Sequence, residues 1–124
     1  MNSELASIIK DIRDDLGDDF LATDFISMDG MSVAGEKAIE NFNSDIVSAH
    51  FTMVMKLATK VSKNMDLGNV NENLVSTDTS LVFSRFLGDG SVYWLLATNK
   101  DATLGIVRTL MDEYELRIWG ALPH

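Results

Sequence analysis

Few side chains in this sequence have the types and spacing that metal binding or nucleophilic catalysis requires. The chain has two histidines and no cysteine, so no thiolate is present as a ligand or a nucleophile. His50 has neither a second histidine four residues away nor a Glu-x-x-His pattern beside it, and His124, the last residue, is expected to be mobile. No Gly-x-Ser-x-Gly motif presents a serine. We therefore expect no enzyme activity, no metal and no cofactor, and we interpret His50 as a packed or interface residue.

Two further motifs match known ligand sites only in part. Four aspartates crowd between positions 14 and 19, but they lack the Asp-x-Asp-x-Asp-Gly run and distal glutamate of a calcium loop. Gly88-Asp89-Gly90 matches half of a phosphate-binding loop, yet the residues after it favour a strand rather than a helix. We interpret the aspartates as a solvated helix end and the glycine motif as a tight hairpin turn.

The formal net charge of −9 argues against two classes of partner. Nucleic acids and anionic membrane surfaces are bound mainly through Lys and Arg, which are outnumbered here 10 to 19 by Asp and Glu. No apolar run approaches the roughly 18 residues of a membrane span, and the N-terminal residues lack the basic and apolar regions of a secretory signal. We expect a cytoplasmic protein that binds neither nucleic acid nor membrane.

Hydrophobic periodicity predicts three helices. Apolar side chains recur at spacings of three and four along residues 3–16, 43–66 and about 104–118. The middle helix is the longest, because it contains neither Gly nor Pro, and Asn43 or Ser44 can cap its start.

Five β-like stretches are expected at about residues 20–28, 31–34, 70–77, 81–87 and 91–98. Asp29-Gly30 joins the first two as a hairpin. Residues 92–97 are apolar at both parities, which predicts a central strand covered by helices on both faces. The predicted fold class is therefore α/β (α+β), a single domain over residues 1–124. It has three layers, α-β-α, with a five-stranded antiparallel sheet and the order α-β-β-α-β-β-β-α.

The apolar positions of the longest helix cover an arc of roughly 160° at 100° per residue, wider than one core-facing stripe needs. These positions are Ile46, Val47, His50, Phe51, Met53, Val54, Leu57, Ala58, Val61 and Met65. The helix is therefore expected to pack against two surfaces. We assign Met53 and Met65 to the core, and Met55, which projects away from the arc, to the surface.

A basic stripe lies beside this arc. Lys56, Lys60 and Lys63 cluster within roughly 60° on another face of the helix. On a protein of charge −9, such a stripe can orient an acidic partner. The alternative interpretation is an ordinary solvated helix face.

The element order and several motifs resemble the Roadblock family of dynein-light-chain-like domains, in particular its bacterial and archaeal MglB-like members. The motifs are Met28-Asp29-Gly30, Phe86-Leu87-Gly88-Asp89-Gly90, Tyr93-Trp94-Leu95-Leu96-Ala97 and Leu104-Gly105-Ile106-Val107-Arg108. The similarity covers about residues 4–118 and rests on the order and spacing of these motifs. It implies a five-stranded sheet with one long helix on one face and two helices on the other.

The resemblance also implies that two copies pair through the third strand and the long helix, as a homodimer. The implied dimer interface consists of Ile46, Val47, His50, Phe51, Val54, Val70, Leu74 and Thr77. As a function, it implies a non-enzymatic regulator or adaptor that activates or tethers a small Ras-like GTPase. The predicted contacts with this partner are Met55, Lys56, Lys60 and Lys63.

Two other functions stay open at this point. One is a structural scaffold subunit without a GTPase partner. The other is a sensor domain that holds a small molecule among Phe25, Tyr93 and Trp94. Arg85 and Arg108 are not assigned as arginine fingers, because one lies in a predicted strand and the other inside a predicted helix.

Overall fold

The computed structural model describes residues 2–123, and its elements follow the predicted order α-β-β-α-β-β-β-α. The helices are α1 (Ser3–Leu16), α2 (Ser44–Asn64) and α3 (Leu104–Ala121), with a short 3-10 turn, η1 (Gly17–Asp19), after α1. The strands are β1 (Phe20–Ser27), β2 (Ser32–Lys37), β3 (Glu72–Ser76), β4 (Ser80–Leu87) and β5 (Val92–Asn99). His124 lies outside the described residues.

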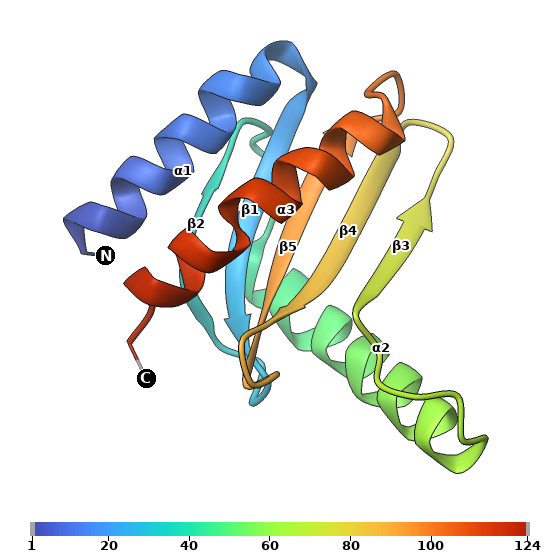
Figure 1. Ribbon diagram of the computed structural model, residues 1–124. Helices are drawn as coiled ribbons and strands as arrows, with labels where there is room; N and C mark the ends of the chain where they lie inside the picture. The colour runs from blue at the N-terminus through green and yellow to red at the C-terminus, as the bar shows by residue number, and fades with distance from the viewer. Residues whose placement is uncertain (1, 124) are drawn as a thin grey trace.

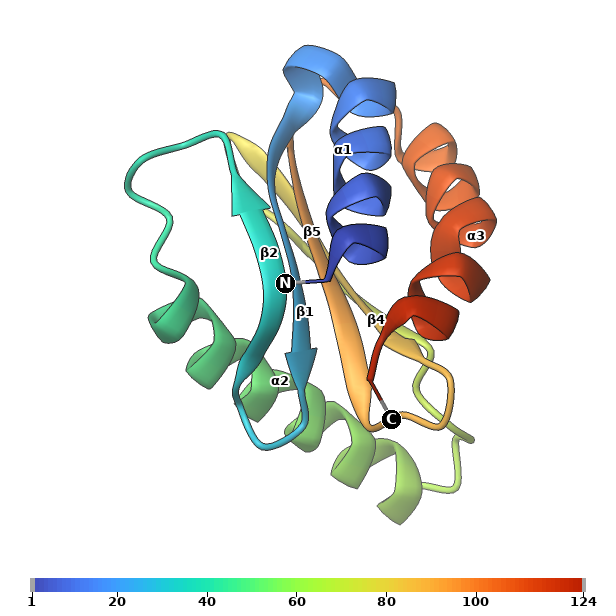
Figure 2. The ribbon, with the colours of Figure 1, turned by 90° about the vertical axis from the view of Figure 1, so that its left-hand side faces the viewer.

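The five strands form one antiparallel sheet in the order β2-β1-β5-β4-β3. Residues 92–98 of the central strand, β5, are all buried, as its apolar pattern predicts. Helices α1 and α3 lie side by side on one face, and α2 lies alone on the other (Figures 1 and 2). The predicted α+β fold with three layers is confirmed, and β2 and β3 are the edges of the sheet.

Asparagine caps set where the first two helices begin. The side chain of Asn2 accepts a hydrogen bond from the backbone N–H of Leu5 at 2.8 Å, and that of Asn43 accepts one from Ile46 at 3.1 Å. Each cap satisfies an N–H group that has no partner inside its helix. Gly17 ends α1 with a positive φ of 56°, which glycine adopts without steric cost.

The larger part of the core lies between the sheet and the helix pair α1 and α3. Phe25 and Trp94 are fully buried there, and the indole Nε1 of Trp94 donates a hydrogen bond to Thr23 Oγ1 at 2.7 Å. Thr23 in turn donates to the carbonyl oxygen of Leu95 at 3.0 Å. The polar atom of the indole is therefore satisfied inside the core. Both aromatic side chains pack as structural core.

A smaller core lies between the sheet and α2. Tyr93 is fully buried there, and its hydroxyl lies 2.9 Å from Thr52 Oγ1 and donates to the carbonyl oxygen of Ser48 at 3.4 Å. Burial raises the pKa of Tyr93 above its ordinary value. The residues of α2 that are buried against the sheet are Ser48, Thr52 and Met55. Thr52 Oγ1 and the backbone carbonyl of Ser48 give the buried phenol its polar partners, while Met55 packs beside it.

This orientation overturns three sequence-based assignments on α2. Met55, predicted at the surface, is fully buried against Tyr93, whereas Met53 and Met65, predicted in the core, are 66% and 65% exposed. The helix is turned so that much of its apolar arc faces away from the sheet.

Asp24 attaches the start of α2 to the sheet. Its carboxylate is almost fully buried and accepts hydrogen bonds from the hydroxyls of Ser32 on β2 and Ser44 at the start of α2. Burial raises the pKa of Asp24, and the two serine hydrogen bonds oppose that rise. Gly35 makes the arrangement possible, because a Cβ there would lie 2.7 Å from the carbonyl oxygen of Thr23 and 2.9 Å from Asp24 Oδ1.

Candidate interaction surface

The side of α2 that faces away from the sheet carries a continuous row of apolar and weakly polar side chains, which we call the outer stripe. Its members are Ile46, His50, Met53, Val54, Leu57 and Val61, which share one face of the helix. Ile46 is 56% exposed and Leu57 is 63% exposed. A single exposed leucine is ordinary, but a row of exposed apolar side chains over four turns is typical of a surface that contacts another molecule.

The predicted interface residues on α2 divide into two groups. Ile46, His50 and Val54 lie on the outer stripe, with the ring Nδ1 of His50 2.8 Å from the carbonyl oxygen of Ile46. Val47 and Phe51 are half-buried and pack against the smaller core. Met53, Leu57 and Val61 were not among the predicted interface residues, although the width of the apolar arc indicated them.

The predicted interface residues near β3 lie in three different settings. Leu74 is paired with Phe83 of β4 and is half-buried against the larger core. Val70 precedes the strand and is half-buried, while Thr77 follows it in an exposed turn. Thr77 Oγ1 accepts a hydrogen bond from the N–H of Ser80 at 2.9 Å. The strand is therefore shorter than the predicted range 70–77.

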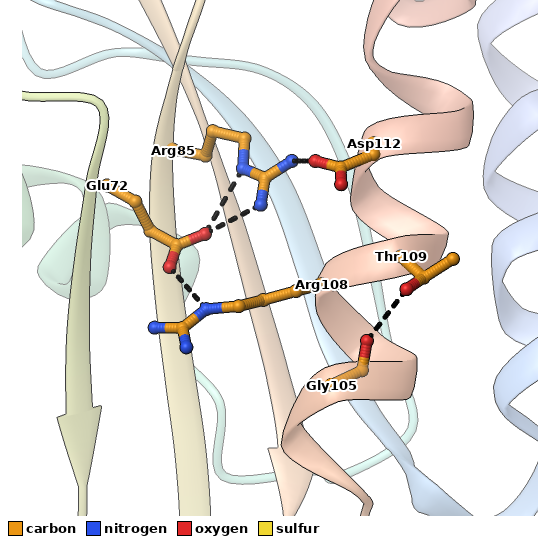
Figure 3. Close-up of polar contacts among 6 residues, drawn as sticks. All are labelled: Glu72, Arg85, Gly105, Arg108, Thr109 and Asp112. Carbon is orange, nitrogen blue, oxygen red and sulfur yellow. Dashed lines mark hydrogen bonds and ion pairs between the residues drawn. The ribbon is translucent and has the colours of Figure 1, made fainter.

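A network of four charged side chains holds the edge strand β3 against β4 and α3 (Figure 3). Glu72 Oε1 on β3 accepts from Nε and Nη2 of Arg85 on β4, at 3.1 and 2.8 Å. Glu72 Oε2 accepts from Arg108 Nε on α3 at 2.9 Å, and Arg85 Nη1 donates to Asp112 at 2.7 Å. Such charge-assisted bonds are shorter and stronger than bonds between neutral groups. The network therefore positions β3 from two neighbouring elements.

The network is poorly exposed at its centre, where the Arg85 and Glu72 side chains are 11% and 14% exposed. Burial opposes the charged form of Arg85, but the hydrogen bonds and charges of Glu72 and Asp112 raise its pKa on balance. Both arginines that could suggest an arginine finger are thus held by carboxylates of their own chain.

The three lysines of the basic stripe line an open groove rather than a flat face. The groove has a volume of about 930 Å³ and lies between the second half of α2, the segment before β3, the β4–β5 turn and the end of α3. Its lining residues are Met28, Lys56, Thr59, Lys60, Lys63, Asn69, Val70, Asn71, Phe86, Gly88, Asp89, Gly90, Glu115, Leu116 and Trp119. Phe25, Tyr93 and Trp94 are absent from this lining, so the structure does not support the sensor pocket expected among them.

The β4–β5 turn, which lines the groove, contains a close contact between Gly88 and Trp119. Gly88 has a φ of +51°, and a Cβ there would lie 2.2 Å from the indole ring. The ring of Trp119 therefore packs directly over the backbone of the turn, which connects the end of α3 to the β4–β5 hairpin. The predicted hairpin turn at Gly88-Asp89-Gly90 is confirmed.

Among residues 2–123, no group of three or more His, Cys, Asp or Glu side chains is arranged to hold a metal ion. Over the same range, no helix has the length and apolar character needed to cross a membrane.

Comparison with known proteins identifies the fold. No protein-family model matches the chain, and no curated protein sequence matches it. Among solved structures, MglB of Myxococcus xanthus aligns with a TM-score of 0.86 at 8% identity, covering 95% of this chain and 94% of that one. A structure described as MglB with tetrameric arrangement aligns with a TM-score of 0.82 at 11% identity, covering 97% and 90%.

A Roadblock/LC7 domain from Streptomyces avermitilis aligns with a TM-score of 0.73 at 15% identity, covering 87% of this chain and 92% of that one. Nearly the whole chain therefore has the fold of MglB and Roadblock/LC7 domains, as the sequence motifs indicated. At these identities the similarity shows the fold alone.

Proposed function

We propose that this protein is a cytoplasmic, non-enzymatic regulator or adaptor that acts as a homodimer, with residues 1–124 as one domain, and binds a small Ras-like GTPase. The observation that carries the proposal is the outer stripe of α2. In a fold shared with MglB and Roadblock/LC7 domains, whose members are typically non-catalytic, this exposed apolar row gives the chain a surface suited to a protein partner.

The dimer is proposed because two features that favour self-association are present in one protomer. The outer stripe has apolar side chains to bury, and β3 is an edge strand whose outer backbone groups have no partner strand within residues 2–123. A two-fold arrangement allows both features to pair with their own copies.

A GTPase is proposed as the partner because the fold is that of MglB and because the chain has a basic row on an acidic background. Lys56, Lys60 and Lys63 are exposed along α2, and they can orient an acidic surface. A regulator of this kind can order the switch loops of the GTPase without contributing a catalytic group.

The test is binding to Ras-like GTPases encoded beside the gene of this protein. Each GTPase is loaded with GDP or with a non-hydrolysable GTP analogue and passed over the immobilised chain. We expect one nucleotide state to bind at least tenfold more tightly, and single-turnover hydrolysis then separates activation from tethering. Dimers that bind no GTPase in either state would refute the proposal and favour the scaffold alternative.

A further inference from the structure

We propose that the lysine-lined groove is a second docking site, separate from the outer stripe, which binds an extended acidic segment of a partner protein. The segment carries apolar side chains between its acidic ones. This inference rests on the proposed function only for the identity of the protein that supplies the segment. The groove itself is defined by α2, the β4–β5 turn and the end of α3.

The charged side chains of the groove favour an acidic occupant. Arg13, Arg85, Arg108 and Arg117 are each paired with carboxylates of their own chain. Lys56, Lys60 and Lys63, like Lys37 and Lys100, form no ion pair with any residue from 2 to 123, and these three lysines line one groove together. Three ammonium groups gathered on one wall of a groove favour an anionic occupant.

The spacing of the lysines fits an extended segment. At a rise of about 1.5 Å per residue, Lys56 and Lys60 lie about 6 Å apart along the axis of α2. In an extended chain, alternate side chains on one side lie about 6.6 Å apart. Acidic side chains at alternate positions of an extended segment can therefore meet successive lysines, while the residues between them point the other way.

Part of the groove is apolar. Phe86, Val70 and Leu116 line it beside the lysines, and Leu116 is 82% exposed on α3. The apolar side chains of an alternating segment would cover these residues. Glu115 also lines the groove and repels acidic groups, so the acidic side chains are directed to the α2 wall. The two walls thus select both the composition and the orientation of the segment.

The probe is a short, end-capped, fluorescently labelled peptide of alternating glutamate and leucine, and binding to the full chain is followed by anisotropy at low salt. The test variant is Lys56→Gln with Lys60→Gln, and the matched control is Lys10→Gln with Lys100→Gln, which removes two charges elsewhere. We expect roughly tenfold weaker binding for the test variant, on the basis of about threefold per exposed ion pair, and less than twofold weaker binding for the control.

Three further measurements make the result specific. Leu116→Ser should weaken binding of the peptide severalfold without changing the oligomeric state, and a peptide with lysine in place of glutamate should not bind. Equal losses in the test and control variants, equal affinity for the lysine peptide, or no binding by the unaltered chain would each overturn the proposal. If the peptide binds as expected but no GTPase does, the groove stands and the function proposed above is wrong.

Discussion

Replacement of Leu57 by serine tests the proposed dimer most directly. Leu57 lies in the middle of the outer stripe and is 63% exposed in the protomer. Complete burial of a leucine side chain contributes about 1.5–3 kcal/mol, so covering this exposed part contributes about 1–2 kcal/mol. In a two-fold dimer the side chain occurs twice, which gives about 2–4 kcal/mol. Leu57→Ser should therefore weaken the dimer about 30-fold to 700-fold.

Sedimentation equilibrium over a range of concentrations measures this dissociation constant. The matched control is Leu116→Ser, because Leu116 is 82% exposed and lies within α3, on the opposite side of the sheet. It makes the same change in a helix, and it should leave the dissociation constant within about twofold. A dimer that tolerates Leu57→Ser, or that responds equally to both changes, would refute the assignment of the outer stripe as the dimer surface.

Three further predictions concern the elements that support the two surfaces. Glu72→Gln removes the shared carboxylate of the network in Figure 3 and should lower the free energy of unfolding, measured by urea titration, by about 3 kcal/mol. The control is Glu36→Gln, because the Glu36 side chain forms an ion pair while 43% exposed; this change should cost less than about 1 kcal/mol. Equal effects would contradict the central position of the network. Gly88→Ala places a methyl group 2.2 Å from an indole ring and should destabilise the protein by at least about 2 kcal/mol, more than Gly90→Ala, where no atom lies within 4 Å. Burial raises the pKa of Asp24, so the folded state binds a proton on this carboxyl group more tightly than the unfolded state does. Protonation of Asp24 therefore stabilises the folded state below the ordinary aspartate pKa, and this stabilisation is lost as the pH rises through the raised pKa. The stability of Asp24→Asn relative to the unaltered protein should therefore increase with pH across that window, and a difference that does not vary with pH would count against the assignment.

The element order was predictable because each element carries its own local signal. Residues 92–97 are apolar at both parities and lie in the central strand, and Asn43 caps α2 as its position before a helical run indicated. The end of β3 was less predictable. Thr77 fits a strand by its branched side chain, but its hydroxyl accepts two backbone N–H groups of the following turn, from Thr79 and Ser80. Such local bonds compete with strand pairing, and hydrophobic pattern does not report them.

The orientation of α2 could not be obtained from hydrophobicity alone. The rule that the apolar side faces the sheet predicts Met55 at the surface, yet Met55 is buried, and Ser48 and Thr52 lie beside it. One interaction between the layers escapes the hydrophobic pattern: the hydroxyl of Tyr93 finds its polar partners, Thr52 Oγ1 and the carbonyl oxygen of Ser48, on α2. A tyrosine in an otherwise apolar central strand was the available signal, together with small side chains spaced four apart on the helix.

The charged network leaves little exposed charge on β3, and this favours the proposed dimer. Edge strands commonly avoid uncontrolled pairing by presenting charged side chains to solvent. On β3, Glu72 is only 14% exposed because Arg85 and Arg108 hold it against the sheet and α3, so its charge contributes little protection to the open edge. On the other edge strand, β2, Glu36 remains 43% exposed. The two edges therefore differ in how well they resist pairing, and the one left unprotected is β3. This asymmetry is expected if pairing at β3 is part of the assembly rather than a hazard to be prevented.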